Sequence, residues 1–209
     1  MSVASANFEK SVFVNCPFDD DYRQILISII FTVKFLGFAP RLTLETSDSG
    51  TTRLATIVNL IESSRFGIHD LSRIRATCEG DHARMNMPFE LGIDYGCKKF
   101  KGNEWNDKRI LVLEKERYRY QVALSDLSGS DIKNHNDEPI IVTKVVRNWF
   151  VTEILRTGPS HTIIWYDFNE FIADLEEKLE EEGHDPDDFG EVPISEIMAY
   201  MDLWFNNKV

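Results

Sequence analysis

The chain has 209 residues, of which 43% are hydrophobic and 28% charged, a composition typical of a globular protein with one large domain. Residues 1–10 show neither a basic start nor an apolar run, and the longest apolar stretch, Ile25–Phe38, carries Lys34 and is shorter than the ~20 residues of a membrane span. Three cysteines without CxxC spacing argue against a disulfide framework or a zinc site. We therefore expect a cytoplasmic protein that binds no metal and does not associate with a membrane.

Nearly all of the net charge of −12 comes from one segment. Between Asp167 and Glu191 there are twelve acidic residues and one lysine, which leaves a net charge of about −1 for the rest of the chain. No basic stripe is present that would hold the phosphates of duplex nucleic acid. A single nucleotide or nucleoside needs no such stripe, because a few backbone N–H groups and one or two arginines can hold it.

The N-terminal part of the chain alternates between strand and helix patterns. A short buried strand begins at Ser11 and is stopped by Pro17. Three acidic residues then open a helix, whose apolar residues recur at helical spacing as far as Gly37. A second strand is predicted over Pro40–Glu45, followed by the polar loop 46–50.

The same alternation continues through the middle of the chain. A helix over Thr52–Ser64 is expected to bury Leu54 among its apolar residues. A third strand, Phe66–Leu71, is short and apolar, as parallel strands are. After a polar loop over 72–86, Pro88 favours the first turn of another helix, and Arg109–Glu114 reads as a fourth strand.

The C-terminal third has a mainly helical pattern. Helices are predicted over Tyr118–Leu127 and Pro139–Leu155. The apolar segment Thr162–Tyr166 is either a last edge strand or a linker into an acidic helix over Asn169–Glu182. A final helix is predicted over Val192–Phe205. We expect the part from Asn169 onward to pack on the main domain or on a partner and to supply no catalytic residue.

Four strand–helix alternations predict an α/β fold with a flavodoxin-like, doubly wound parallel sheet. We expect it to occupy residues 1–160, with a helical extension over 161–209 packed on it. Ligands of such sheets bind outside the carboxyl ends of the strands. The loops at Asn15–Phe18, Glu45–Gly50, Asp70–Arg73 and Glu114–Tyr120 are therefore expected to meet at one edge.

Two common nucleotide-binding motifs are absent from the first of these loops. The segment Asn15–Asp19 contains neither GxGxxG nor GxxxxGK[ST]. The chain is therefore not expected to be a dehydrogenase with a Rossmann dinucleotide grip or a P-loop NTPase.

The most specific pattern lies around the third strand and the helix after it. The strand ends in Asp70-Leu71-Ser72, and the later segment contains Asn86 and then Phe89-Glu90-Leu91-Gly92. Glu90 is expected in the first turn of its helix, where the positive end of the helix dipole favours an anion. These two elements, with the segment Phe13–Phe18, resemble the superfamily shared by nucleoside 2-deoxyribosyltransferases and TIR domains. The resemblance covers about residues 11–127.

This resemblance implies cleavage or transfer at an N-glycosidic bond. The catalytic carboxylate of the family maps onto Glu90, and the preceding acidic residue, which contacts ligand or orients the glutamate, maps onto Asp70. A carboxylate suits this chemistry because it stabilises or captures an oxocarbenium-like state. NAD would be a substrate and not a cofactor, and no other cofactor is implied.

Eight further residues are candidates for substrate binding: Asn15, Pro17, Phe18, Glu45, Arg53, Ser72, Asn86 and Tyr118. Each also has a structural interpretation. Asn15 and Asp70 are suited to capping a loop, and an aromatic such as Tyr118 more often packs in a core. His69 alternates away from Asp70 along the strand, so it is expected to pack beneath a helix and not in the site.

The sequence thus leaves three hypotheses open. The first is a TIR-like glycohydrolase that cleaves NAD in bacterial anti-phage defence. The second is a nucleoside or nucleotide 2-deoxyribosyltransferase or hydrolase. The third is a domain without turnover that binds a nucleotide, associates with itself or assembles with a defence partner.

Overall fold

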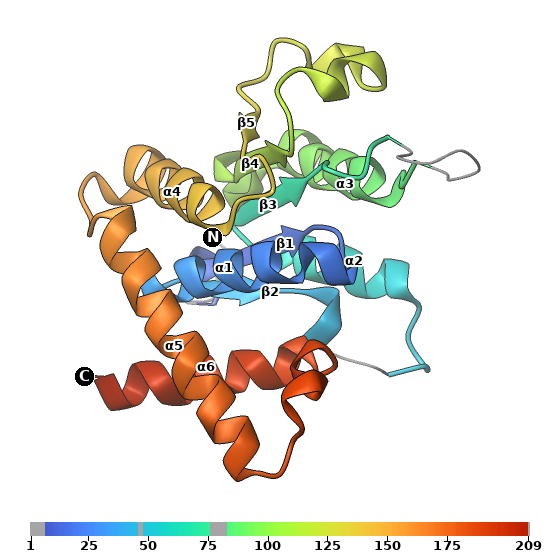
Figure 1. Ribbon diagram of the computed structural model, residues 1–209. Coiled ribbons are helices and arrows are strands. Elements are labelled where there is room, and N and C mark those ends of the chain that lie inside the picture. Colours follow the sequence, from blue (N-terminus) through green and yellow to red (C-terminus); the bar gives the residue numbers. More distant parts are fainter. Residues whose placement is uncertain (1–6, 46–47, 76–82, 209) are drawn as a thin grey trace.

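The computed structural model describes residues 7–45, 48–75 and 83–208, and its centre is a parallel sheet of five strands (Figure 1). The strand order is β2-β1-β3-β4-β5, and all four neighbouring pairs are parallel. This confirms the predicted flavodoxin-like α/β fold. The strands are β1 Ser11–Asn15, β2 Ala39–Arg41, β3 Phe66–Asp70, β4 Arg109–Glu114 and β5 Lys133–Asn134.

Helices cover both faces of this sheet. Helices α1 (Arg23–Phe35) and α4 (Pro139–Phe150) pack together on one face, and α2 (Arg53–Glu62) and α3 (Asn86–Phe100) pack together on the other. Every residue of β1 and of β3 is buried, which explains why these strands read as apolar runs without alternation.

Two strands differ from the sequence prediction. The second strand ends at Arg41, because the Glu45 carboxylate accepts hydrogen bonds from Arg41 Nε at 3.0 Å and from the Leu42 N–H, which turns the chain into a 3₁₀ helix over Thr43–Glu45. The fifth strand was not predicted. It pairs only with Leu113 and Glu114, a length too short to produce a hydrophobic pattern.

Two helical predictions in the main domain were wrong in detail. Leu54 is 48% exposed, whereas Leu60 is buried in its place, because the buried face of α2 is turned toward Phe13 of β1. The segment predicted as a helix over Tyr118–Leu127 forms two short 3₁₀ turns instead, at Arg119–Val122 and Ser125–Leu127. Tyr118 has a φ of 65°, a left-handed conformation that interrupts a helix.

The C-terminal helices pack against α1. Helix α4 continues as a π-helix over Val151–Leu155, and α5 spans His161–Glu181. Both alternatives for Thr162–Tyr166, an edge strand and a linker, were therefore wrong, because these residues form the first turns of α5 and the Ser160 side chain caps them. The last helix, α6, spans Ile194–Lys208. Figure 1 shows α5 and α6, in orange and red, crossing beside α1.

An aromatic cluster joins these helices to the main domain. The fully buried ring of Phe31 in α1 lies 5.0–5.7 Å, centroid to centroid, from four rings of α5 and α6. These rings are Phe168, Phe171, Trp204 and Phe205.

Among the described residues, no helix is long and apolar enough to cross a membrane.

We expect Phe31→Ala to destabilise the protein by about 3–5 kcal/mol, because it removes the ring that four others contact and leaves a cavity. For a chain of this length the melting temperature should fall by roughly 2–4 °C for each kcal/mol. Thermal unfolding followed by circular dichroism measures this. Val122→Ala is the control, because Val122 is 80% exposed, and a similar loss in both variants would contradict the role of the cluster.

Candidate functional site

The carboxyl ends of β1 and β3 meet the beginning of α3 at one edge of the sheet. Asn15, the last residue of β1, uses its side-chain nitrogen to contact Nδ1 of His69 at 3.0 Å and to donate to the Met87 carbonyl oxygen at 3.0 Å. Met87 lies in the first turn of α3, and Glu90 follows three residues later on the same face. Asn15 and Glu90 therefore lie at the same edge, as the candidate site requires.

Glu90 is a buried carboxylate. It is the fifth residue of α3 and not a first-turn residue as predicted, because the helix begins at Asn86. It is only 4% exposed and makes no hydrogen bond or ion pair to another described residue. Burial raises the pKa of Glu90 to about 7, and the positive charge of Arg53 acts weakly against this rise. Glu90 is thus able to exchange a proton near neutral pH.

The charge of Arg53 acts on this carboxylate, and Phe18 packs against Arg53. The Arg53 guanidinium, at the exposed start of α2, stands over the Phe18 ring at 5.7 Å from the centroid. On the other side, burial raises the pKa of the Cys16 thiol, and the negative charges of Asp70, Glu90 and Asp19 raise it further. Several acidic side chains therefore gather at this edge of the sheet, and the Arg53 guanidinium acts on one of them, Glu90.

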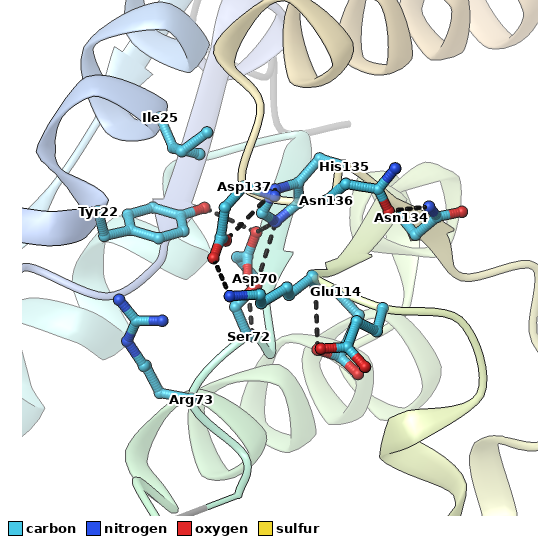
Figure 2. A network of polar contacts seen from close by, with 12 residues as sticks. Tyr22, Ile25, Asp70, Ser72, Arg73, Glu114, Asn134, His135, Asn136 and Asp137 are labelled. Carbon is cyan, nitrogen blue, oxygen red and sulfur yellow. Dashed lines mark hydrogen bonds and ion pairs between the residues drawn. The ribbon is translucent and has the colours of Figure 1, made fainter. Parts of the chain in front are cut away.

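Asp70 is the centre of a buried polar network, shown in Figure 2. One oxygen accepts hydrogen bonds from the Tyr22 hydroxyl at 2.6 Å and from Nε2 of His135 at 2.8 Å, and the other accepts the Ser72 N–H at 2.7 Å. The Ser72 hydroxyl also lies 3.1 Å from His135 Nε2. Asp70, Ser72 and His135 are all buried, so these contacts hold Asp70 in one orientation.

The network determines the protonation of its two charged groups. Burial alone would raise the pKa of Asp70, but the charge and hydrogen bond of His135, with bonds from Ser72 and Tyr22, lower it overall. Burial acts to lower the pKa of His135, and Asp70 outweighs this and raises it. His135 Nδ1 accepts the Asp137 N–H at 3.1 Å, so in the neutral ring the proton lies on Nε2. Asp70 is therefore an ionised acceptor.

His135 and Tyr22 were missed by the sequence interpretation. His135 follows β5, whose two residues gave no strand signal, so nothing placed it at the carboxyl edge of the sheet. Tyr22 reads as an ordinary apolar position at the start of the first helix, and only the fold brings its hydroxyl to Asp70.

The loop after β3 is anchored to the loop after β1. Asp19 forms ion pairs with Arg73 at 2.7 Å and with Arg84 at 3.3 Å. The hydrogen bond from Arg73, with its charge and that of Arg84, lowers the pKa of Asp19 against the opposing effect of burial. The Arg84 N–H also bonds the Arg73 carbonyl at 3.0 Å. Both ends of the loop are thereby fixed near the candidate site, while 76–82 fall outside the described residues.

The remaining predicted binding residues have different surroundings. Pro17 is buried beside Cys16, and Asn86 is exposed at the start of α3. Glu45 is bonded to its own strand. Tyr118 is 67% exposed and lines a separate cavity of about 300 Å³ beyond β4, together with Glu114 and Tyr120. No described contact joins Glu45 or Tyr118 to Glu90.

A larger groove of about 580 Å³ lies at the open edge of β4, between α3, α4 and the segment 124–133. Leu91, Ile110, Leu127 and Trp149 are among its lining residues. Glu90, Asp70 and Asn15 do not line it. The groove is therefore separate from the cluster of polar residues at the carboxyl edge of the sheet.

Comparisons of this chain with family models, with curated proteins and with solved structures found no match. A carboxylate with a pKa of about 7 that is influenced by the charge of one arginine is suited to stabilising a developing positive charge or to accepting a proton.

The buried charge of Glu90 predicts a pH-dependent effect of Glu90→Gln on stability. The folded-state pKa of about 7 exceeds the ordinary value of 4.5, so the stabilising contribution of Glu90 is complete below about pH 4.5 and is lost as the pH rises through about 7. Glutamine does not titrate. The melting temperature of Glu90→Gln relative to wild type should therefore increase between pH 5 and pH 8, by roughly 2–4 °C or more.

Melting curves at both pH values measure this difference. The control is Glu177→Gln, because Glu177 is exposed on α5. A difference between Glu90→Gln and wild type that stays constant with pH would show that Glu90 is ionised at pH 5 and that its environment is not apolar.

Proposed function

We propose that this chain is an N-glycosidase that cleaves NAD between nicotinamide and ribose, with Glu90 as its catalytic carboxylate. The observation that carries the proposal is the placement of Glu90. It is buried, unpaired among the described residues, and located at the carboxyl edge of a doubly wound sheet, where such folds bind ligands. The resemblance of Asp70-Leu71-Ser72 and Phe89-Glu90-Leu91-Gly92 to TIR-like enzymes supports the same role.

In the proposed reaction the bond between ribose C1′ and the pyridinium nitrogen breaks, and its electron pair leaves with nicotinamide. The ribose becomes an oxocarbenium-like cation. A water molecule then adds at C1′ and releases one proton. The ionised Glu90 stabilises the positive centre and is then placed to accept that proton, because its pKa of about 7 is close to neutral pH.

The state of Asp70 favours NAD over an ordinary nucleoside. A purine or pyrimidine leaves readily only when it is protonated, and Asp70 is ionised, buried and already accepts three hydrogen bonds. Nicotinamide leaves from a cationic ring as a neutral base and needs no proton.

Arg53 and Phe18 are the proposed contacts for the rest of the nucleotide. A guanidinium at the entrance is suited to a phosphate oxygen, and the adjacent aromatic ring offers a stacking surface for a base. A cytoplasmic role in anti-phage defence, alone or with a partner protein, is proposed from the TIR-like resemblance.

We expect Glu90→Gln to reduce release of nicotinamide from NAD by roughly a hundredfold or more, with little change in NAD affinity. Glutamine keeps the shape of the side chain but cannot carry the charge that the transition state requires, so the loss should appear in kcat. Chromatographic quantification of nicotinamide under saturating NAD measures the effect. The matched control Glu177→Gln should retain full activity.

Equal turnover by wild type and Glu90→Gln would show that Glu90 is not the catalytic group. Release of a free base from nucleosides, without cleavage of NAD, would instead support the nucleoside hydrolase or transferase alternative. A protein that binds NAD but leaves it intact would support a binding module.

Asp70→Asn should give the opposite pattern. The substitution removes the charge that the Tyr22 hydroxyl and His135 face, so the free energy of unfolding should fall by about 1–3 kcal/mol. Turnover of NAD per folded molecule should stay within roughly tenfold of wild type, because Asp70 protonates nothing in the proposed reaction. A loss of turnover as large as that of Glu90→Gln, measured in the same nicotinamide assay, would mean that Asp70 takes a direct part in cleavage.

A further inference from the structure

A second buried polar network lies on the α3 face of the sheet, opposite the network of Asp70. Four side chains form it: Asn15 of β1, His69 of β3, Asp94 of α3 and Lys108, which precedes β4. His69 Nε2 lies 2.9 Å from Asp94 Oδ2, and Lys108 Nζ forms an ion pair with Asp94 Oδ1 at 3.1 Å. None of the four is more than 2% exposed. His69 thus packs beneath α3, as the sequence predicted.

The direction of each hydrogen bond in this network follows from one carbonyl group. Because the Met87 carbonyl oxygen can only accept, the Asn15 amide must present its nitrogen to it. The same nitrogen faces His69 Nδ1, so Nδ1 is the acceptor and the ring proton lies on Nε2. His69 therefore donates to Asp94, and the chain of bonds has one consistent arrangement.

Lys108 and Gly67 also support this arrangement, Lys108 through further hydrogen bonds and Gly67 by leaving space for the Asp94 carboxylate. Lys108 Nζ also donates to the carbonyl oxygens of Ile61, at 2.9 Å, and of Ser64, so it fixes the end of α2 against α3. A Cβ atom at Gly67 would lie 2.2 Å from Asp94 Oδ2, so only glycine in β3 allows the carboxylate to approach this closely. Burial acts to raise the pKa of Asp94, but His69 and Lys108 outweigh it and lower it.

This network holds α3 at two points, and Glu90 lies between them. Asn15 binds the backbone at Met87, and His69 and Lys108 bind the side chain of Asp94. Met87, Glu90 and Asp94 follow each other at spacings of three and four residues, so they share one helix face, and all three are buried. A displacement of either point would move Glu90 relative to the ends of the strands.

We propose that Asn15, His69, Asp94 and Lys108 are positioning residues that fix Glu90 in the orientation required for glycosidic cleavage. The expected effect on catalysis rests on the proposed function. The expected effect of the network on the surroundings of Glu90 does not depend on that function. A network in which every buried charge has a partner tolerates one arrangement and resists partial displacement. That property suits a carboxylate that must meet a reacting centre within a fraction of an ångström.

The test uses Asp94→Asn, which keeps the size of the side chain and removes its charge, and Asn15→Ala, which removes the two contacts of the amide and leaves the Lys108–Asp94 ion pair. The control is Val146→Ala. Val146 is fully buried in α4 on the opposite face of the sheet, so it lowers stability without contact to α3. Two measurements are made on each protein: the titration midpoint of the Glu90 carboxyl by carbon-13 NMR, and the steady-state kinetics that give kcat and KM for NAD.

We expect the midpoint of Glu90 to fall from about 7 toward its ordinary value of 4.5 in both network variants, because a loosened α3 admits water. In Asp94→Asn, kcat should fall roughly tenfold to a hundredfold, while KM changes by less than about threefold. Val146→Ala should lower the melting temperature and change neither the midpoint nor kcat.

The proposal would be overturned if the network variants lose stability as Val146→Ala does but keep the Glu90 midpoint and the kcat of wild type. If Asp94→Asn does not fold, Asn15→Ala decides through the same two measurements. If wild type does not cleave NAD, the proposed function fails, and the NMR midpoint still decides whether the network controls the surroundings of Glu90.

Discussion

The structure depends on the burial of two consecutive polar residues at the end of β3. His69 and Asp70 point to opposite faces of the sheet, as neighbours on a strand must, and both are fully buried. Each needs a partner, because an unpaired polar or charged group in a protein interior is costly. Each finds one in a histidine–carboxylate contact: His69 with Asp94 at 2.9 Å, and Asp70 with His135 at 2.8 Å.

These two contacts connect the strand to the elements around it. The first draws α3 onto the sheet and, through Lys108, also holds the end of α2. The second brings the start of α1, through Tyr22, and the end of β5 to the same edge. One strand end thereby sets the relative positions of helices on both faces. The C-terminal helices stabilise the fold from another side, through the aromatic cluster around Phe31.

Glu90 differs from the other buried carboxylates of this region. Asp70 and Asp94 have lowered pKa values because histidine, lysine or hydroxyl groups surround them. Burial raises the pKa of Glu114, but its carboxylate is paired with Arg119 at 2.8 Å. Burial also raises the pKa of Glu90, to about 7, and Glu90 has no such partner among the described residues. Paired carboxylates hold structure, and an unpaired one among them carries a cost in stability that structure alone does not explain. This contrast within one sheet edge is the physical basis for assigning chemistry to Glu90.

The strand–helix alternation, the parallel sheet and a helix around Glu90 could be predicted from the sequence, because these follow from the local spacing of apolar residues and from Pro88. Which polar groups meet depends on how the chain folds. Asp94 lies 25 residues from His69, and His135 lies 65 residues from Asp70, distances over which no local pattern operates. The raised pKa of Glu90 could not be predicted from the sequence either. It depends on how closely α3 packs on the sheet and on how much water is excluded there.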